Sequence, residues 1–364
     1  MRFQWIHDIG EFENLSPLWD EAALQAQTNN PFLQSDFICT WWKYFSKNRL
    51  LCILAILKDK KIIAGLPLYA QSFTTFYRKL SYMGNVAANY TEPFSLLPCE
   101  ETIPIIFKAL ANLPKWDILD LRQVRPHSSL ISCFHNSRSN YNVSSTNTHL
   151  NWSMNINLGA SPNISKKHHR DLRSRRRRVE ADLGPLRLVK IEGSQRVASS
   201  FDEFMKLSSQ TFTRRKKASM FSDVKLSLFF KDYFTQLSSK NKIHALMLYA
   251  GNHLLAITYA YNVPQEFGWV LTSFNDDFKH YRPGYLLIEE LIGYMKNLNI
   301  SFYNWYGHEA LYKKQWCNET FPLTRIRICK KTLKMNFVSW VCSSIHGNSK
   351  TKEVVKSFIK RIIS

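Results

Sequence analysis

The stretch FGWVLTSFNDDFKHYRPGYLLIEELIGYMKNLNISFYNWYGHEALYKKQW, from Phe267 to Trp316, decides the fold of this chain. An apolar run at 269–274 predicts a strand, and the helical spacing of apolar residues after Arg282-Pro283-Gly284 predicts a helix. A second strand-like run follows at 300–306. This order predicts a βαβ unit whose turn directs free backbone N–H groups at an anion, such as the phosphate of a cofactor.

Composition sets wide limits on the remaining possibilities. The 364 residues allow one large domain or two ordinary ones, and a hydrophobic content of 45% excludes a wholly disordered chain. No apolar run approaches the roughly 18 residues of a membrane-spanning helix, and the acidic N-terminus is unlike a secretory signal, so we expect a cytoplasmic protein. The net charge of +21 favours polyanionic partners: nucleic acid, anionic lipid or phosphate-rich ligands.

Cysteine and histidine spacing gives no metal site. The seven cysteines are scattered without a C-x-x-C pair, and no histidines show ligand spacing, so we expect buried free thiols and no metal.

The chain repeats an order of elements. Hairpin patterns lie at 50–70, with a turn at Asp59, and at 243–262, with a turn at Gly251-Asn252. Each is followed by a third strand-like run, an amphipathic helix and a closing strand. We therefore expect an α/β (α+β) protein of two similar halves, each a mixed β-sheet flanked by helices, covering 1–150 and 151–330.

Two basic segments stand apart from this repeat. Residues 161–237 read as a basic helical insertion in the second half, with Arg173 and Arg177 on one face of its first helix. Residues 331–364 form a basic amphipathic tail, which could pack on the body or touch an anionic membrane.

These patterns together resemble a known superfamily. They comprise the Trp-rich segment PFLQSDFICTWWKYF, the hairpin ending Gly65-Leu66-Pro67-Leu68, the basic helix, Arg282-Pro283-Gly284 before a helix, and Ala310-Leu311-Tyr312-Lys313-Lys314-Gln315-Trp316 after the last parallel strand. The C-terminal half resembles the GNAT (Gcn5-related) N-acyltransferases. The whole chain, over about residues 17 to 330, resembles the bacterial CelD-like acetyltransferases, relatives of the Fem-type aminoacyl transferases with two GNAT-like halves.

The resemblance implies a donor site at the turn before the helix. In GNAT enzymes this turn holds the pyrophosphate of acetyl-CoA, which here would fall to Arg282, Pro283, Gly284 and Tyr285. The turn departs from the usual signature, because Tyr281 and Leu286 stand where Gln or Arg and a small residue are expected. Proline also removes one N–H donor. The cofactor implied is acetyl-CoA or another acyl-CoA, without a metal.

The resemblance also assigns chemistry to the short helix. Tyr312 would protonate the departing thiolate, and Lys313 would stabilise the oxyanion of the tetrahedral intermediate, as the corresponding lysine does in Fem-type enzymes. His308 and Glu309 are candidates for the general base, although Glu309 equally suits a helix N-terminus.

Acceptor contacts are assigned more broadly. The resemblance places Tyr90 and Glu92 where related N-terminal halves contact the acceptor, and Arg173 and Arg177 could hold a phosphorylated acceptor, CoA or tRNA. A solvated helix face is the competing interpretation for the arginines, as packed core is for Tyr312 and a solvated surface position is for Lys313.

The function implied is transfer of an acyl group from acyl-CoA to an amine, carried by a small molecule, saccharide or peptide. One alternative is a Fem-type transferase that uses aminoacyl-tRNA, which the charge favours but the lack of a long heptad segment disfavours. The other is an inactive GNAT-fold protein that binds polyanions. Contact with tRNA or with the inner membrane surface stays open.

Overall fold

The computed structural model describes residues 1–74, 77–84, 87–91, 93–126, 141–158, 164–214, 220–307 and 309–332. Its contacts divide the chain into two units. Unit 1 comprises Met1–Gln27, Ser46–Thr148 and the residues from Leu323 onward, and unit 2 comprises Thr28–Phe45 and His149–Pro322.

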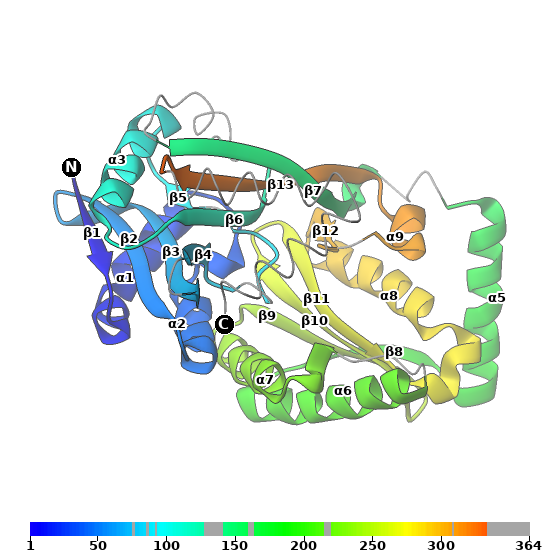
Figure 1. The fold of residues 1–364 in the computed structure, drawn as a ribbon. Helices are drawn as coiled ribbons and strands as arrows, with labels where there is room; N and C mark the ends of the chain where they lie inside the picture. The colour runs from blue at the N-terminus through cyan, green and yellow to red at the C-terminus, as the bar shows by residue number, and fades with distance from the viewer. Residues whose placement is uncertain are drawn as a thin grey trace, which may run out of the picture. The chain divides into compact units, whose positions relative to one another are not determined.

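Unit 1 contains one mixed sheet with two covering helices (Figure 1). Its elements are β1 (Arg2–Ile6), α1 (Ile9–Gln25), β2 (Leu50–Lys58), β3 (Lys61–Thr74), β4 (Tyr77–Tyr82), β5 (Phe94–Ser95), α3 (Cys99–Asn112), β6 (Ile118–Val124) and most of β13 (Glu319–Lys330). The strand order is β1-β2-β3-β4-β6-β13, with β5 beside β3. All neighbours are antiparallel except β4 and β6, which are parallel because α3 connects them.

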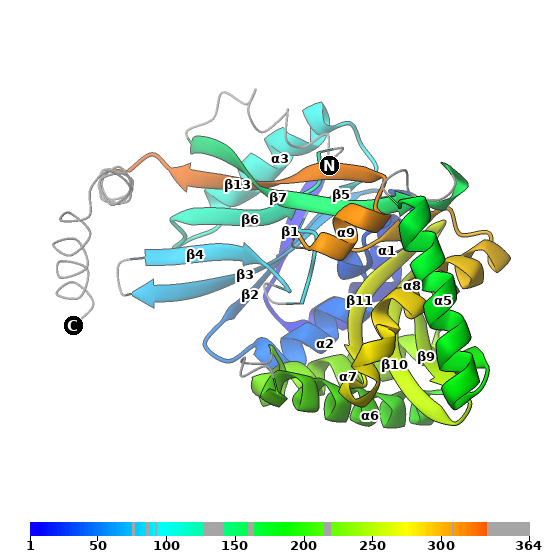
Figure 2. The ribbon, with the colours of Figure 1, turned by 90° about the vertical axis from the view of Figure 1, so that its right-hand side faces the viewer.

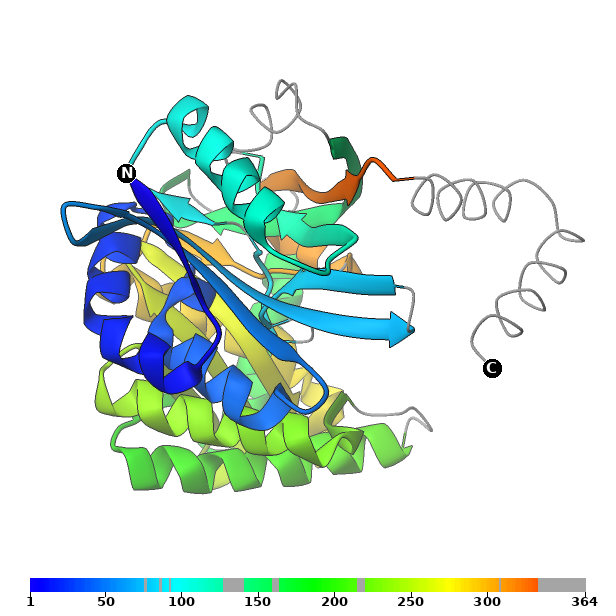
Figure 3. The ribbon, with the colours of Figure 1, turned by 60° about the vertical axis from the view of Figure 1, so that its left-hand side comes forward.

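The two helices of unit 1 pack against its strands from different sides (Figure 3). Trp19 of α1 fills the space over Gly65 of β3, where an added Cβ would lie 2.5 Å from the indole ring. On α3, the carbonyl of Ala109 accepts a hydrogen bond from the indole N–H of Trp5 in β1, at 3.2 Å.

Unit 2 repeats this sheet with other segments of the chain. Its elements are η1 (Pro31–Leu33), α2 (Ser35–Phe45), the end of β7 (Tyr141–Asn155), η2 (Ile156–Leu158), α5 (Lys166–Leu183), β8 (Leu186–Ile191), α6 (Ser194–Arg214), η3 (Met220–Ser222), α7 (Val224–Ser239), β9 (Ile243–Ala250), β10 (His253–Val263), β11 (Glu266–Phe274), η4 (Asp276–Tyr281), α8 (Pro283–Asn297), β12 (Phe302–Asn304) and α9 (Leu311–Trp316). The strand order is β7-β12-β11-β10-β9-β8, and only β11 and β12 are parallel.

Helices cover both faces of the unit 2 sheet. Figures 1 and 2 show α5 beside α8, and α6 beside α7 on the other side of the strands. Leu287 and Leu291 of α8 belong to the core with Ala256 and Ala260 of β10. The alternate residue Tyr259 instead stacks on Phe234 of α7, with ring centroids 4.8 Å apart. The two-residue period of the strand therefore separates two apolar layers.

The predicted repeat is confirmed and is more complete than expected. Along the chain, each repeat runs strand, two helices, three antiparallel strands, helix and parallel strand, although α2 of the first repeat packs in unit 2. An antiparallel sixth strand completes each sheet. The predicted hairpins are β2–β3 and β9–β10, with positive φ angles of 49° at Asp59 and 53° at Gly251 in their turns. The sixth strands are exchanged in sequence, since unit 1 uses β13 and unit 2 uses β7.

The segment 161–237 differs from the insertion that we expected. Strand β8 lies within it, and β8, α6 and α7 correspond to β1, α1 and α2, so only α5 is an addition to the repeat. Strand β8 is a short, half-buried edge strand between two helices, and Arg187 and Lys190 interrupt its apolar residues without a regular alternation, so its signal in the sequence is weak.

The division at residue 150 also needs one correction, because residues 28–45 pack in unit 2. Phe37 of α2 lies edge-on to Phe229 and Tyr233 of α7, with centroids 5.9 and 5.5 Å apart. Asp36 accepts hydrogen bonds from the ammonium groups of Lys240, at 2.5 Å, and Lys242, at 3.1 Å. An aromatic face with ion pairs at its end therefore fixes α2 on α7.

Two further sequence expectations concern single residues and the tail. Cys39, Cys52, Cys317 and Cys329 are free thiols as expected, whereas Cys99 is disulfide-bonded. The predicted amphipathic tail lies outside the described residues, apart from 331 and 332.

Candidate functional site

The site begins where the parallel strands β11 and β12 separate. Their pairing ends at Gly268 and Asn304. Strand β11 continues to Phe274, whereas β12 ends at Asn304. Gly268 allows this separation, because a Cβ there would lie 2.3 Å from the hydroxyl of Tyr306. Tyr306 has a positive φ of 44°, and its N–H donates to the side-chain oxygen of Asn304 at 3.1 Å.

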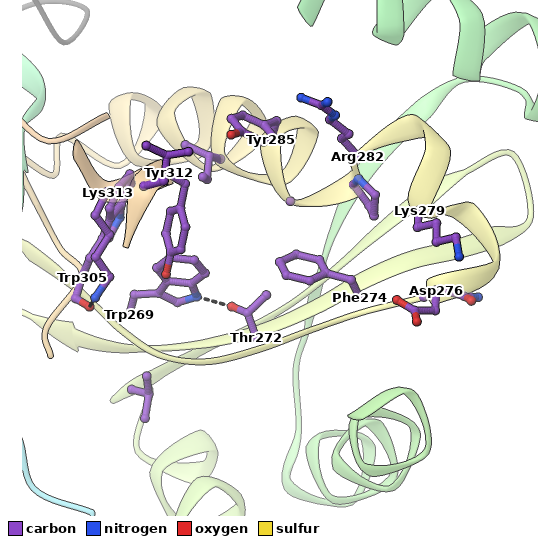
Figure 4. A pocket seen from close by; sticks show the side chains of 16 residues that line it. Trp269, Thr272, Phe274, Asp276, Lys279, Arg282, Tyr285, Trp305, Tyr312 and Lys313 are labelled. Atoms are coloured by element: carbon purple, nitrogen blue, oxygen red, sulfur yellow. Dashed lines mark hydrogen bonds between the residues drawn. The ribbon is translucent and has the colours of Figure 1, made fainter. Parts of the chain in front are cut away.

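A cavity of about 590 Å³ occupies the opening (Figure 4). Strand β11, the start of α8 and the start of α9 contribute its walls. Its aromatic lining consists of Trp269, Phe274, Tyr285, Trp305 and Tyr312. The indole N–H of Trp269 donates to the hydroxyl of Thr258, at 2.7 Å, and also to that of Thr272. The floor of the cavity is therefore a fixed apolar surface that suits an uncharged chain.

The N-terminus of α8 forms the polar end of the cavity. Arg282 precedes the helix in the left-handed conformation, with φ 54° and ψ 61°, and makes no side-chain cap. Pro283 is the first helical residue and has no N–H, so the N–H of Gly284 is the first one available to a ligand. A Cβ on Gly284 would lie 3.1 Å from the ring of Phe274. Glycine therefore lets the helix start close to the strand.

The cavity rim at this end is positively charged. Lys279 and Arg282 both line it, and the described part of the chain supplies no ion-pair partner to either. The nearby carboxylates of Asp276 and Asp277 instead face Arg214, at 3.9 and 2.8 Å. Two unneutralised cations beside a helix N-terminus favour a phosphate-bearing ligand.

Tyr312 extends from α9 into the cavity. Figure 4 shows its ring pointing toward Trp269, and the two centroids are 5.9 Å apart at 74°. Burial raises the pKa of Tyr312 to about 12. The phenol therefore stays protonated at any physiological pH and can donate a proton.

Lys313 points from the same helix toward the end of β12. Only 6% of the residue is exposed, and its ammonium donates to the carbonyl oxygens of Trp305, at 3.1 Å, and Tyr306, at 2.5 Å. Burial lowers its pKa to about 8. Two of the three N–H donors thus hold the separated strand end, and one remains for a ligand.

The structure brings six of the twelve predicted site residues into one cavity. They are Arg282, Pro283, Gly284, Tyr285, Tyr312 and Lys313.

The other six predicted residues lie elsewhere. Glu309 is largely exposed and forms an ion pair with Lys314 instead of lining the cavity. Tyr90 is fully buried in unit 1, with the guanidinium of Arg125 over its ring at 4.5 Å, so it is a core residue there. His308 and Glu92 lie outside the described residues. Arg173 and Arg177 are exposed on α5 and do not line the cavity.

The structure separates the arginines of α5 into two groups. Arg176 contacts Glu180, Glu289 and Glu290, and so ties α5 to α8. Within the described ranges no acidic partner meets Arg173 or Arg177. The sequence run therefore combines a structural arginine with a solvated basic face.

Sequence reasoning missed the aromatic walls and His168. The imidazole of His168 packs on Tyr285, with centroids 5.2 Å apart, and its Nε2 is buried without a hydrogen-bond partner. Burial and the neighbouring cations lower its pKa. The only indication in the sequence was the His-His pair at the start of the basic helix, which the arginines overshadowed.

The described residues offer neither a cluster of metal-binding side chains nor a helix suited to crossing a membrane. They contain no group of three or more His, Cys, Asp or Glu side chains arranged to hold a metal ion. Their helices include none with both the length and the apolar character to cross a bilayer.

The segment that forms this site was compared with known protein families. Residues 166–314 match the family model described as an acetyltransferase (GNAT) domain. No sequence among the curated proteins matches the chain significantly.

Three solved structures share the fold over most of the chain. FemX is 9% identical with a TM-score of 0.64, covering 93% of this chain and 99% of its own. A conserved protein of unknown function from Bacteroides thetaiotaomicron is 10% identical with a TM-score of 0.57, covering 91% and 100%. L-PGS from Bacillus licheniformis is 11% identical with a TM-score of 0.54, covering 92% and 97%. These similarities concern the fold alone, which the chain shares with FemX over most of its length, while the match to a GNAT domain comes from the family model.

Proposed function

Starting from the match of residues 166–314 to a GNAT domain, we propose that the protein is an acyltransferase that moves an acyl group from acyl-CoA to an amine. The observation that carries this proposal is a single cavity with an anion-binding helix start at one end and a protonated tyrosine at the other. Lys279, Arg282 and the N–H of Gly284 bind the donor's phosphates, and the aromatic floor receives its uncharged arm.

The proposed reaction is direct attack of the amine on the thioester. The amine nitrogen forms a bond to the carbonyl carbon, and the carbonyl oxygen becomes an oxyanion. When the intermediate collapses, the carbon–sulfur bond breaks and the sulfur leaves as a thiolate. Tyr312 gives its phenolic proton to that thiolate, and the amine's proton passes to a base that the described residues do not identify. Binding both reactants together supplies part of the rate.

Lys313 has a positioning role in addition to the electrostatic one that the resemblance implied. Its two hydrogen bonds to the carbonyls of Trp305 and Tyr306 keep the strand end separated. Its positive charge, with one N–H free, stabilises the oxyanion at short range. It is thus a positioning residue and an electrostatic one in the same proposal.

The proposal is tested by thermal stabilisation of the full chain with acetyl-CoA, longer acyl-CoAs and free CoA. We expect a saturable rise in melting temperature that Gly284→Glu abolishes, because the new side chain meets Phe274 and places a carboxylate on the phosphate turn. Gly293→Glu is the matched control, because it lies in the same helix with nothing within 4 Å of its Cβ position. No stabilisation at millimolar CoA would refute the acyl-CoA donor.

A second candidate is a Fem-type transfer from aminoacyl-tRNA. The exposed Arg173 and Arg177 of α5, which have no acidic partner in the described ranges, favour it together with the net charge of +21. Salt-sensitive binding of aminoacyl-tRNA, weakened by Arg173→Gln with Arg177→Gln, would support this candidate, whereas saturable stabilisation by acyl-CoA would support the first.

A further inference from the structure

Helix α5, which is not part of the repeat, packs against η4 and α8 (Figure 2). Its C-terminal end meets the last residue of η4, because the phenol of Tyr281 donates a hydrogen bond to the carboxylate of Asp182 at 2.7 Å. The Nε atom of Arg178, one turn earlier, lies 3.7 Å from the same carboxylate oxygen, and its guanidinium lies 5.9 Å from the centre of the Tyr281 ring. Helix α5 thus holds Tyr281 through both its hydroxyl and its ring.

The end of α5 that carries Asp182 is fixed against the β9–β10 turn. The N–H of Gly251 donates to the carbonyl of Pro185 at 3.0 Å, and the guanidinium of Arg187 donates to the carbonyl of Gly251 at 2.8 Å. A Cβ on Gly251 would overlap the carbonyl oxygen of Leu183, so this close approach requires glycine. Asp182 therefore projects from a backbone that can move little relative to the sheet.

The residue after Tyr281 is the strained point of the turn. Arg282 has φ 54° and ψ 61°, a left-handed conformation that is unfavourable for a residue with a Cβ. Its side chain makes no cap. Its N–H donates to the carbonyl of Lys279, and its carbonyl accepts from the N–H of Tyr285, both at 3.0 Å. A conformation of this kind persists only where the surrounding contacts hold it, and the fixed Tyr281 is the adjoining contact.

The conformation of Arg282 sets the direction of the start of α8. Because Pro283 has no N–H, the N–H of Gly284 is the first donor at the polar end of the cavity. Relaxation of Arg282 to the right-handed region would redirect the chain at this point. The N–H of Gly284 would then no longer face the rim where the donor's phosphates bind.

We propose that Asp182 is a positioning residue for the donor: through its hydrogen bond to Tyr281 it holds Arg282 in the left-handed conformation and keeps the start of α8 open to a phosphate. This inference rests on the proposed function, because it concerns the turn that binds the donor. Asp182 acts through Tyr281 and does not touch the ligand. Its negative charge alone would weaken the binding of an anion. Its contribution to binding is therefore geometric, and it is opposite in sign to the electrostatic one.

The size of the effect follows from the population of the binding-competent turn. An apparent dissociation constant equals the intrinsic one divided by the fraction of molecules in the competent conformation. Without support, the left-handed conformation is disfavoured by roughly five- to thirtyfold. Loss of the hydrogen bond should therefore weaken phosphate binding by about tenfold. A purely electrostatic effect of removing Asp182 would strengthen it.

The test is isothermal titration of the full chain with free CoA and, separately, with inorganic pyrophosphate. We expect Tyr281→Phe and Asp182→Ala each to weaken both ligands by about tenfold. The double variant should bind no more weakly than either single one, because both changes remove the same hydrogen bond. Asp182→Asn keeps an oxygen that accepts from the phenol and should restore the affinity to within a few-fold. Asp171→Ala is the control, because it removes an exposed carboxylate from the same helix, and it should not weaken binding.

The two ligands separate this inference from the proposed donor. Equal CoA affinity in the wild type and in Tyr281→Phe, at unchanged melting temperature, would refute the positioning role and leave the acyl-CoA donor standing. Pyrophosphate binding that depends on Tyr281, without any binding of CoA, would refute the donor and keep the positioned turn. Binding of neither ligand, additive losses in the double variant, or equal weakening by Asp171→Ala would overturn the inference.

Discussion

The two units have the same strand order and differ at the end of their one parallel pair. In unit 2 the strands part at Gly268, and the next helix begins with Arg282-Pro283-Gly284, which leaves a cavity of about 590 Å³. In unit 1 the pair ends at Asp120, and α3 begins with Glu100 and Glu101 in its first turn.

This difference shows that the same topology can carry opposite charges at the start of the corresponding helix. Acidic residues at a helix N-terminus oppose an anion there, whereas an open N-terminus attracts one. Unit 2 therefore places positive potential on backbone N–H groups and rim cations, next to a tyrosine able to donate a proton. In unit 1 the acidic first turn of α3 opposes such a ligand. The comparison predicts chemistry in unit 2 and not at the corresponding place in unit 1.

The largest expected effect comes from Tyr312→Phe. Loss of the phenolic proton should lower kcat by about 10²–10⁴-fold, the usual contribution of a general acid, while acyl-CoA still stabilises the protein. Steady-state kinetics with the thermal-shift titration measures both quantities. Tyr249→Phe, on β9 and outside the cavity, is the matched control. Full activity in Tyr312→Phe would remove the proposed acid and with it the contrast between the units.

The pH dependence of Lys313 gives the next largest effect. Because burial lowers its pKa from 10.5 to about 8, the ammonium loses its charge as the pH rises above about 8. If the charge stabilises the oxyanion, kcat/KM should fall up to tenfold per pH unit above that value. Lys313→Arg keeps the charge and should abolish this fall. A wild-type profile that stays flat between pH 8 and 9.5 would contradict the electrostatic role and leave only the positioning role.

Glycine substitutions in the two sheets should have moderate and separable effects. An added Cβ would overlap Trp19 at Gly65 and Tyr306 at Gly268, so each Ala variant should lose about 1–3 kcal/mol of unfolding free energy through overpacking. Only Gly268→Ala should also lower kcat, because it displaces the carbonyl that Lys313 binds. Denaturant unfolding and kinetics measure both effects, with Gly293→Ala as control. Equal loss of activity in the two variants would argue against a separation of roles.

The smallest effect tests the placement of α2. Two lysines, Lys240 and Lys242, lower the pKa of Asp36 below 3.8 against the opposing effect of burial. Asp36→Asn should therefore cost about 1 kcal/mol of stability at neutral pH. This contribution is present above the unfolded pKa and disappears as pH falls through the lower folded value. Urea unfolding at pH 7 and pH 3 measures it, beside the exposed Asp171→Asn. A difference that is no smaller at pH 3 than at pH 7 would exclude the ion pairs as its cause.

The sequence predicted the repeat because its hairpins and amphipathic helices are local patterns. The turns at Asp59 and Gly251 need positive φ, and those residue types indicate it directly. The first turns of α8 and α9 are also local patterns in the sequence, and six predicted residues from these two segments meet in one cavity.

The remaining features depend on long-range packing, which local patterns do not report. Strand β8 is an edge strand whose apolar residues are interrupted by two basic ones. Helix α2 packs on residues nearly two hundred positions away. Tyr90 was predicted to contact the acceptor, because the sequence alone does not show that its ring is fully buried. Asp120 on β6 forms ion pairs with Lys79 on β4 and Arg325 on β13, and these residues are far apart in the sequence.

The exchange of segments between the units has a consequence for biosynthesis. Phe37 leaves the ribosome roughly 190 residues before its partner Phe229, a delay of about 10–40 s at roughly 5–20 residues per second. Unit 1 in turn lacks β13 until residues beyond 323 are made. Neither unit can be completed in the order of translation. The aromatic face of α2 must therefore remain without its partner helix during about half of synthesis, so the nascent chain exposes this face while the residues between α2 and α7 are made.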